Sequence, residues 1–523
     1  MRINKLTSII ASVILLAGCT KGTHQSIDTI IIGDFIYNGA SQTPFSGVIG
    51  IDKGNIVFVQ KHLPTDIKAK KTINAQDLII APGFIDPHTH ACNDFKGGLT
   101  NLNANYLTQG VSTVFCNVDG GGDVDVAGTL QDYQQQGIGT NVGLYVGHGS
   151  VRKAVMGRVN RTPSNSELEQ MRELVKEAMN AGALGLSTGL YYVPGNYATT
   201  EEVIELAKIA AEHGGVYDSH IRDESSYSIG LIGAIEEVIA IGEEAKLPVH
   251  IAHIKALGTD VWGESEQVIK LIDNARARGI EVSADQYPWR ASGTSVAGSL
   301  VPREVLAGSK EEYLARLQDA AQWPAIRTAM LENLRRRGGA DSLLISDPTR
   351  PDIRGKTLAQ IAEDWQLDAI DAAKKIIISG NARVASFNMS EDDIKAYMQA
   401  PWVMTSSDGS PGHPRKYASF PKKYHEYVYQ KKWLNLAEFI YKSSTLTAET
   451  FGLTNRGKLV VGNVADIVIF DKEKFAANAD YLNPEKLSSG VQWMLINGQL
   501  AIDNGKVLNV LAGQTIRQNQ SLR

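Results

Sequence analysis

Two histidines stand two residues apart in the segment Gly83-Phe84-Ile85-Asp86-Pro87-His88-Thr89-His90. On an extended strand, side chains two positions apart point to the same face, so His88 and His90 can hold one cation together. Neutral imidazole is a ligand that suits zinc. Because such a pair is common by chance, a metal site needs further ligands from elsewhere in the chain.

Further candidate ligands end other apolar segments. His220 ends the segment Asp218-Ser219-His220, His253 ends His250-Ile251-Ala252-His253, and Asp408 lies in Ser406-Ser407-Asp408-Gly409. Histidines and an aspartate that all follow apolar runs are hard to explain as core residues. The pattern predicts a metal site that holds one or two zinc ions.

Eight apolar runs that end in polar residues alternate with segments of helical periodicity. The runs are Leu78–Asp86, Ser112–Val118, Asn141–Val146, Leu184–Leu190, Val216–Ser219, Val249–Ile254, Glu281–Asp285 and Trp402–Ser407. Helices are expected between them at Ser166–Asn180, Glu201–Glu212, Ile229–Glu244 and Ser265–Arg278. This alternation predicts an α/β fold, a (β/α)8 TIM barrel over residues 81–430, whose active site forms at the carboxyl ends of the strands.

The barrel is expected to carry one insertion and one accessory domain. A long interval with helical periodicity separates the seventh and eighth runs, which predicts a mainly helical insertion at about residues 296–400. Short strand-like runs with intervening glycines occupy residues 27–80 and resume over residues 455–523. We therefore expect a small β-sandwich assembled from both ends of the chain.

The first residues have the features of a bacterial lipoprotein signal. Arg2 and Lys5 precede a short apolar stretch that ends in Leu16-Ala17-Gly18-Cys19. A buried first helix is the alternative, but no second, polar face is visible. We expect residues 1–18 to be a signal peptide, Cys19 to be lipidated, and residues 19–26 to link the anchor to the folded domain. The protein would then lie on the periplasmic side of a bacterial membrane, with the outer membrane expected.

Composition limits the other partners. The 523 residues carry a formal net charge of −5, which argues against a nucleic-acid partner. The run Arg335-Arg336-Arg337 is expected on the solvated last turn of a helix.

Cys92 and Cys116 can pair in an oxidising compartment, although two cysteines are weak support for a disulfide framework.

Several motifs together resemble the N-acyl-D-amino-acid deacylase (D-aminoacylase) family of the amidohydrolase superfamily. They include Ala81–His90, Gly147–Arg152, Gly182–Leu190, Ser219–Glu224, Ala252–Lys255, Asp285–Pro288, Ser407–Gly409 with His413–Arg415, and Gly457–Asp466. The resemblance covers nearly all residues after the linker. It implies hydrolysis of a linear amide, releasing a D-amino acid from an N-acyl-D-amino acid or from a dipeptide with a C-terminal D-residue.

The chain departs from this family after the second strand, where the family places a metal-bridging cysteine. Alignment on Gly110–Val114 puts Asp119 at that position, and Cys116 lies three residues earlier. A carboxylate can also bridge two ions, so Asp119 is the preferred ligand and Cys116 the alternative. The family's strand-six histidine precedes Lys255 by two residues, which selects His253 over His250. The number of metal ions stays open.

The resemblance also implies roles in catalysis and substrate binding. Asp408 is expected both to bind the metal and to transfer the proton from water to the leaving amine. Lys255, Tyr287 and Arg415 are expected to bind the substrate carboxylate, with Arg290 a weaker candidate. Asp86 is expected to support the ligands rather than to bind metal. His148 and Arg152 belong to a family motif, but no mechanistic role follows for them.

Three other functions fit parts of the pattern. A hydantoinase-like cyclic amidase would need a lysine on the fourth strand, and Leu184–Leu190 contains none. A nucleobase deaminase would share the histidines and Asp408 but would lack the carboxylate-binding residues. A non-catalytic lipoprotein that binds a ligand through a relic site is the alternative outside enzymes.

Overall fold

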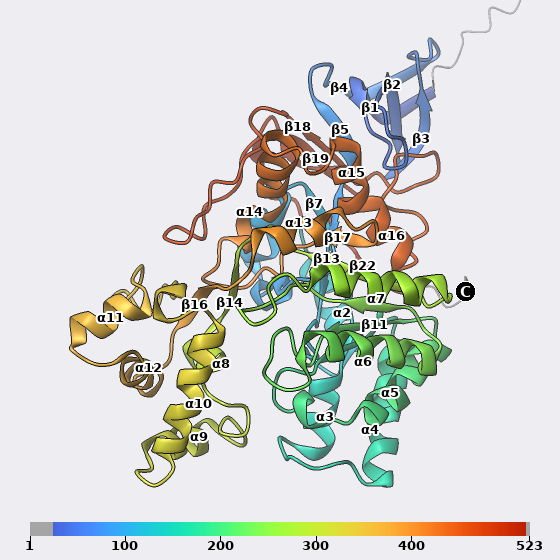
Figure 1. Ribbon diagram of the computed structural model, residues 1–523. Helices are drawn as coiled ribbons and strands as arrows, with labels where there is room; N and C mark the ends of the chain where they lie inside the picture. The colour runs from blue at the N-terminus through green and yellow to red at the C-terminus, as the bar shows by residue number, and fades with distance from the viewer. Residues whose placement is uncertain (1–24, 519–523) are drawn as a thin grey trace, which may run out of the picture.

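The computed structural model describes residues 25–518 (Figure 1). The predicted signal peptide and Cys19 lie outside the described residues. Within the described part of the chain, no helix combines the length and apolar character needed to cross a bilayer.

Both ends of the chain build one nine-stranded sheet. The N-terminal part supplies β1 (Gln25–Ile36), β2 (Phe45–Asp52), β3 (Asn55–Gln60), β4 (Ile67–Asn74) and β5 (Ile79–Pro82). The C-terminal part supplies β18 (Ile467–Phe470), β19 (Val491–Ile496), β20 (Gln499–Asp503) and β21 (Lys506–Val507). The two parts join where β18 pairs antiparallel with β5, and Figure 1 shows the blue and orange strands side by side. This sheet is consistent with the predicted β-sandwich from both termini.

The central strands are parallel and fall into two hydrogen-bonded sheets. One sheet contains β6 (Phe84–Asp86), β7 (Val111–Cys116), β8 (Asn141–Leu144) and the short β22 (Thr515–Ile516). The other contains β9 (Val146–Gly147), β10 (Gly185–Gly189), β11 (Val216–His220), β12 (Val249–Ile251), β13 (Val282–Gln286) and β17 (Val403–Thr405).

The two parallel sheets meet at both edges. Only Tyr145 separates β8 from β9, so these two segments continue one another. At the other edge, Thr89 and Gly409 form a parallel bridge just beyond β6 and β17. The resulting order of strands is consistent with the predicted barrel, and it brings the carboxyl ends of all the strands to one side.

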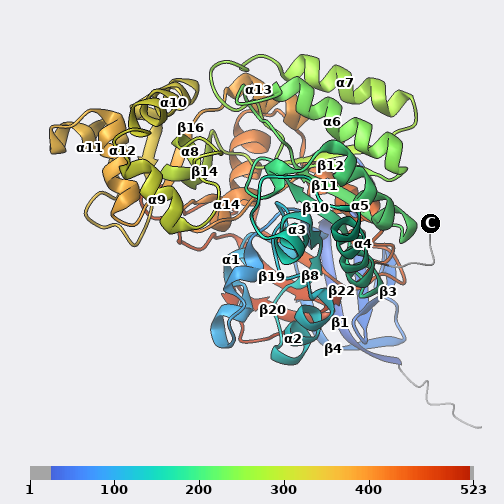
Figure 2. The ribbon, with the colours of Figure 1, turned by 90° about the horizontal axis from the view of Figure 1, so that it is seen from below.

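Helices cover the outside of the parallel strands (Figure 2). They are α2 (Val126–Gln136), α3 (His148–Met156), α4 (Asn165–Asn180), α5 (Thr200–Glu212), α6 (Gly230–Ala245), α7 (Ser265–Ala277) and α13 (Glu391–Gln399). In α4, Ser164 and Glu167 form a capping box, and Met171 and Val175 lie on the buried face. After β17 the chain forms α14 (Arg415–Lys422), α15 (Leu436–Ile440) and α16 (Leu446–Thr450).

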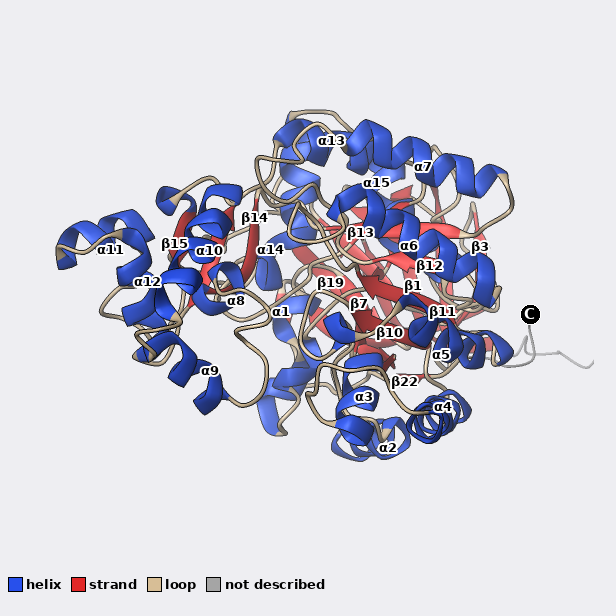
Figure 3. Ribbon diagram, turned by 60° about the horizontal axis from the view of Figure 1, so that its bottom comes forward, coloured by secondary structure: helices blue, strands red, loops and turns tan. Residues whose placement is uncertain are grey.

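The insertion between β13 and β17 has a core of its own, which includes Leu317, Met330 and Ile376. Its helices are α8 (Val296–Leu300), α9 (Lys310–Gln318), α10 (Trp323–Arg336), α11 (Leu358–Trp365) and α12 (Ala369–Ile378). The insertion also contains an antiparallel sheet of β14 (Ala291–Ser295), β16 (Arg383–Phe387) and β15 (Leu343–Ile345), which the sequence did not predict. Figure 3 shows the insertion to one side of the barrel strands.

Candidate metal centre and active site

The six predicted metal ligands converge at the carboxyl ends of the parallel strands. His88 and His90 follow β6, Asp119 follows β7, His220 ends β11, His253 follows β12 and Asp408 follows β17. Their potential ligand atoms form two groups, each with all atoms within 4.8 Å of one another. His88, His90, Asp119 and Asp408 make one group, and Asp119, His220 and His253 make the other.

Asp119 lies at the centre because both groups contain it. His88 Nε2, His220 Nδ1 and His253 Nε2 lie 3.3, 3.4 and 3.4 Å from Asp119 Oδ1. His90 Nε2 lies 3.4 Å from Asp119 Oδ2 and 3.5 Å from Asp408 Oδ1. One carboxylate therefore faces four imidazoles.

These separations fit ligands of a common ion better than hydrogen bonds. Two atoms that each lie about 2.1 Å from a tetrahedral zinc ion are about 3.4 Å apart. Both ring nitrogens of His88, and Nδ1 of His220, are also buried without a hydrogen-bond partner among the described residues. Buried polar atoms are usually paired, so these nitrogens indicate a partner such as a metal ion. The donors present thus fit zinc.

Three of the ligands stand on backbone in the left-handed region. Asp119 has φ +56°, His253 φ +37° and Asp408 φ +46°. Residues with side chains rarely adopt this conformation, and it recurs at functional sites. Hydrogen bonds support two of the turns, since the His253 N–H donates to Asp285 Oδ1 at 3.0 Å and the Asp408 N–H donates to the His88 carbonyl at 3.0 Å. The turns direct residues beyond the strand ends back into the site.

The structure argues against one of the two strand-two candidates. Cys116, the last residue of β7, forms a disulfide with Cys92, so its sulfur is not available as a metal ligand. The alternative prediction, that Cys116 is the strand-two ligand, is therefore wrong. The possible pairing of Cys92 with Cys116 is present in the structure. Asp119, the preferred candidate, belongs to both groups of candidate ligand atoms.

On the sixth strand, His250 is the alternative ligand to His253, and it lies away from the candidate ligand atoms. His250 Nε2 lies 2.8 Å from Asp285 Oδ2, and its Nδ1 lies 2.8 Å from Ser283 Oγ, so both nitrogens of His250 are engaged away from the ligands. Asp86 is fully buried and accepts the N–H groups of His88 and Ser407. It braces the ligand-bearing segments, as predicted, and does not join either ligand group.

The charges of the site favour a bound cation. Burial tends to raise the pKa of Asp119, but His88, His220 and His253 outweigh it and hold that pKa well below its usual range. Burial lowers the pKa of His90, but Asp119 and Asp408 outweigh it and raise the value to about 9. Without a metal, His90 therefore attracts a proton, whereas burial lowers the pKa of His220. A divalent cation would replace the proton on His90, so metal binding should release it.

Glu224 belongs to the site, although no role for it follows from the sequence. Its Oε1 lies 3.1 Å from His253 Nδ1, and its Oε2 lies 3.8 Å from His220 Nε2. A carboxylate that accepts the Nδ1–H of His253 leaves the Nε2 lone pair free to face Asp119 and a metal. The only signal in the sequence is the acidic residue four positions after His220.

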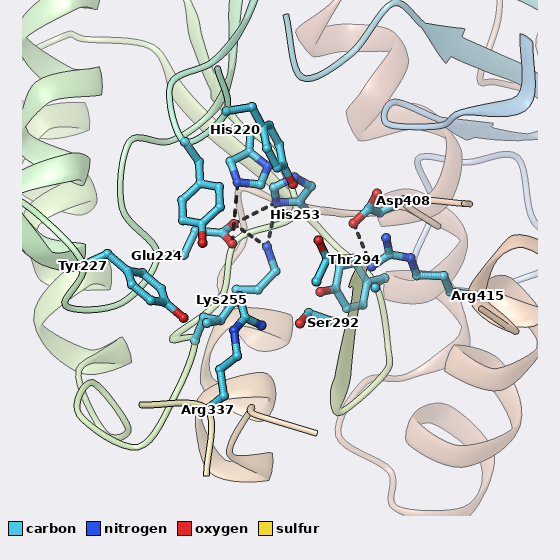
Figure 4. Close-up of a pocket in the computed structure, with 15 residues that line it drawn as sticks. His220, Glu224, Tyr227, His253, Lys255, Ser292, Thr294, Arg337, Asp408 and Arg415 are labelled. Atoms are coloured by element: carbon cyan, nitrogen blue, oxygen red, sulfur yellow. Dashed lines mark hydrogen bonds and ion pairs between the residues drawn. The ribbon is translucent and has the colours of Figure 1, made fainter. Parts of the chain in front are cut away.

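A pocket opens beside these ligands, and it contains the three predicted substrate-binding residues (Figure 4). Arg415 Nη1 lies 2.8 Å from Asp408 Oδ2, and the guanidinium lies 4.8 Å from the Tyr287 ring centroid. Lys255 forms an ion pair with Glu224, and its Nζ lies 2.7 Å from His253 Nδ1. Lys255 therefore already has a counter-ion. Arg290 is exposed and does not line the pocket.

Comparisons with known proteins identify the family. Residues 71–338 match the profile of the amidohydrolase family. An N-acyl-D-glutamate deacylase from Alcaligenes xylosoxydans xylosoxydans is 30% identical over 91% of this chain and 93% of its own length. The chain belongs to the D-aminoacylase family of amidohydrolases. A D-aminoacylase from the same organism is 29% identical and covers 92% of this chain and 95% of its own.

A solved structure shows the same relationship. The crystal structure of N-acyl-D-glutamate deacylase from Bordetella bronchiseptica, complexed with zinc and a phosphonate that mimics the tetrahedral intermediate, superposes with a TM-score of 0.79. It is 28% identical and covers 94% of this chain and 100% of its own. As a member of the D-aminoacylase family, the protein is a hydrolase that acts on the carbon–nitrogen bond of linear amides.

His148 and Arg152 of this amidohydrolase have a structural role. Both are buried on α3, and both contact Glu202 of α5, with His148 Nε2 at 2.9 Å from Glu202 Oε1. Burial tends to raise the pKa of Glu202, but His148 and Arg152 outweigh it and lower the value. The carboxylate therefore stabilises the fold at neutral pH, and this contribution is lost as the pH falls through the lowered pKa.

We expect Glu202→Gln to lower the free energy of unfolding by about 3 kcal/mol, because it leaves the buried Arg152 without a counter-ion. Urea denaturation at pH 7 measures the change. Glu205→Gln is the control, because Glu205 lies on the same helix and forms surface pairs with Arg172 and Lys208. That variant should lose at most about 1 kcal/mol. Equal stability of the two variants would contradict the structural role.

Proposed function

We propose that this amidohydrolase uses zinc to hydrolyse N-acyl-D-amino acids, releasing a carboxylic acid and a free D-amino acid. The observation that carries the proposal is Asp119, which is shared by two groups of candidate ligand atoms and lines a cavity that Arg415 also lines. The substrate class is supported by the relatives, which are named D-aminoacylase and N-acyl-D-glutamate deacylase.

The ligands proposed for the metal are His88, His90, Asp119, His220, His253 and Asp408. Zinc is supported by the imidazole and carboxylate donors and by the zinc in the Bordetella bronchiseptica relative. When bound, zinc supplies Lewis-acid chemistry, which lowers the pKa of water and polarises a carbonyl group. The two ligand groups that share Asp119 leave room for one ion or two.

Asp408 is proposed to move the proton. One of its oxygens faces His90, and the other accepts a hydrogen bond from Arg415. Burial tends to raise the pKa of Asp408, but Arg415 and His253 outweigh it and hold that pKa well below its usual range. The ionised carboxylate can accept a proton from the attacking water and then donate it to the leaving nitrogen.

Arg415 and Tyr287 are proposed to bind the α-carboxylate of the substrate. Both are buried in the pocket wall next to Asp408, so a carboxylate held there places the neighbouring amide close to the base. Lys255 is proposed to support this binding and to balance Glu224. A dipeptide with a C-terminal D-residue offers the same amide and the same carboxylate, so it belongs to the proposed substrate class.

A screen of the zinc-loaded protein tests this function. The library contains N-acetyl-D-amino acids, their L-enantiomers, dipeptides with a C-terminal D-residue and hydantoins, and the readout is the release of free amine. We expect D-substrates to be hydrolysed faster than their enantiomers, with activity lost on chelation and recovered with zinc. Hydrolysis of L-substrates or hydantoins alone, or of no compound, would overturn the proposal.

We further propose that the mature chain is anchored through lipidated Cys19 and faces the periplasm. The support is the Leu16-Ala17-Gly18-Cys19 segment, which follows a basic start and a short apolar stretch. Mass spectrometry of the N-terminal peptide from bacterial membranes tests this. An unmodified Cys19 preceded by Gly18 would contradict it.

A further inference from the structure

Arg337 lies inside the pocket, not on a solvated helix end. The prediction for the run Arg335-Arg336-Arg337 is wrong at this position, because Arg337 follows the last turn of α10 with only 3% of its surface exposed. The insertion presses this end of α10 against the barrel, so the third arginine lines the same pocket as His253 and Asp408 (Figure 4). Arg335 stays outside and pairs with Asp260.

Arg337 differs from the other buried arginines in its partners. Arg152 pairs with Glu202, Arg415 with Asp408 and Arg456 with Asp466. Across residues 25–518, no carboxylate lies within ion-pair distance of Arg337. Its Nε donates to the Ser299 carbonyl at 3.0 Å, and its Nη1 donates to Ser386 Oγ at 3.3 Å.

A buried guanidinium without a counter-ion is costly, because arginine stays protonated and transfer of an unpaired charge out of water is unfavourable. The neutral oxygens of Ser299 and Ser386 satisfy part of its hydrogen bonding but not its charge. Lys255, another cation of this pocket, is neutralised by Glu224. The charge of Arg337 is therefore available to an anion that enters the pocket.

Tyr227 provides a second, independent sign of a ligand. Its hydroxyl lines the pocket, is buried and has no hydrogen-bond partner among the described residues. Its ring centroid lies 5.9 Å from Arg337 Cζ. Burial raises the pKa of Tyr227 to about 12, so the hydroxyl keeps its proton and can donate to an acceptor.

We propose that Arg337 and Tyr227 form a second anion subsite, which binds the side-chain carboxylate of an acidic D-residue. Figure 4 shows these two residues on one side of the pocket, with Asp408 and Arg415 on the other. A substrate with two carboxylates, an N-acyl derivative of D-glutamate or D-aspartate, would place its α-carboxylate at Arg415 and its second carboxylate at Arg337. This assignment rests on the proposed deacylase function.

The test compares N-acetyl-D-glutamate with N-acetyl-D-glutamine, which differ in charge but hardly in shape. We expect the unmodified enzyme to prefer the acid by at least about tenfold in kcat/KM. Arg337→Met should lower kcat/KM for the acid by about 100-fold, mainly through KM, because it removes a buried charged hydrogen bond. The amide should change by less than about threefold. Arg335→Met, on the same helix but outside the pocket, should behave as the unmodified enzyme.

Two further measurements address misfolding of the variant and a different origin of the anion. If Arg337→Met does not fold, Tyr227→Phe and the acid–amide comparison on the unmodified enzyme still decide, with a loss of about tenfold expected for the acid alone. N-Succinyl-D-alanine and N-butanoyl-D-alanine test whether the anion comes from the acyl group instead. A dependence of the succinyl substrate on Arg337 would overturn the side-chain assignment.

Two outcomes distinguish failure of this inference from failure of the proposed function. Hydrolysis of neutral N-acyl-D-amino acids without preference for the acid, or an equal loss on both substrates in Arg337→Met, would refute only the subsite. If no N-acyl-D-amino acid is hydrolysed, the deacylase function itself is wrong.

Discussion

Asp408→Asn is expected to lower kcat by about 1,000-fold, because an amide cannot accept the proton of the attacking water. The side chain keeps its shape, so KM should change much less than kcat. Steady-state kinetics on the best substrate from the screen measure both constants, and elemental analysis measures the zinc content. Since Asp408 is also a proposed ligand, the zinc content shows whether lost activity reflects lost metal.

Asp260→Asn is the matched control for this change. Asp260 and Arg335 form a pair with the same 2.8 Å separation as Asp408 and Arg415, but they lie outside the pocket. This variant should keep the kcat of the unmodified enzyme. A kcat for Asp408→Asn within about tenfold of the unmodified enzyme, at full zinc content, would exclude Asp408 as the proton carrier.

Asp119→Ala is expected to remove the metal and the activity together. The change removes the carboxylate that lies within 3.4 Å of His88, His220 and His253, and it leaves the imidazoles without their central anion. Loss of an outer partner of a metal ligand already lowers affinity by about 10- to 100-fold, so loss of a shared ligand should exceed about 100-fold. Zinc titration with a competing chelator measures the affinity.

The control replaces both cysteines of the disulfide by serine. The bridge closes a loop with a sequence separation of 24 residues, so its loss should lower stability by about 3 kcal/mol. Zinc affinity should stay close to that of the unmodified enzyme, because neither cysteine belongs to the two groups of candidate ligand atoms. Loss of zinc in this double variant, with zinc retained in Asp119→Ala, would reverse the assignment of the strand-two ligand.

Much of the site could be predicted because it lies at strand ends. The apolar runs before His88, His220, His253 and Asp408 are long enough to identify as strands, and parallel strands bring their carboxyl ends to one side. The same local patterns placed the barrel helices. In α4 and α5, polar caps and apolar periodicity mark the ends within one or two residues.

The strand-two ligand needed the tertiary structure. On an extended strand, Cys116 and Asp119 would point to opposite faces, because they are three residues apart. The strand ends at Cys116, however, and the chain then turns, with φ +56° at Asp119. Counting along an extended strand therefore does not show which side chain reaches the metal. The turn packs against β10, where a side chain at Gly189 would come within 2.2 Å of the Asp119 carbonyl oxygen. Contact between distant segments decides which residue reaches the metal.

Residue order alone thus determined the strand-end ligands, the barrel helices and the enzyme family, since each depends on periodicity or on short motifs. Only the folded chain decided that Arg337 enters the pocket, that Glu224 supports His253 and that Cys116 pairs with Cys92. A run of arginines at a helix end looks solvated unless one knows what packs against it. Burial and charge pairing arise between segments far apart in the chain, so local patterns do not contain them.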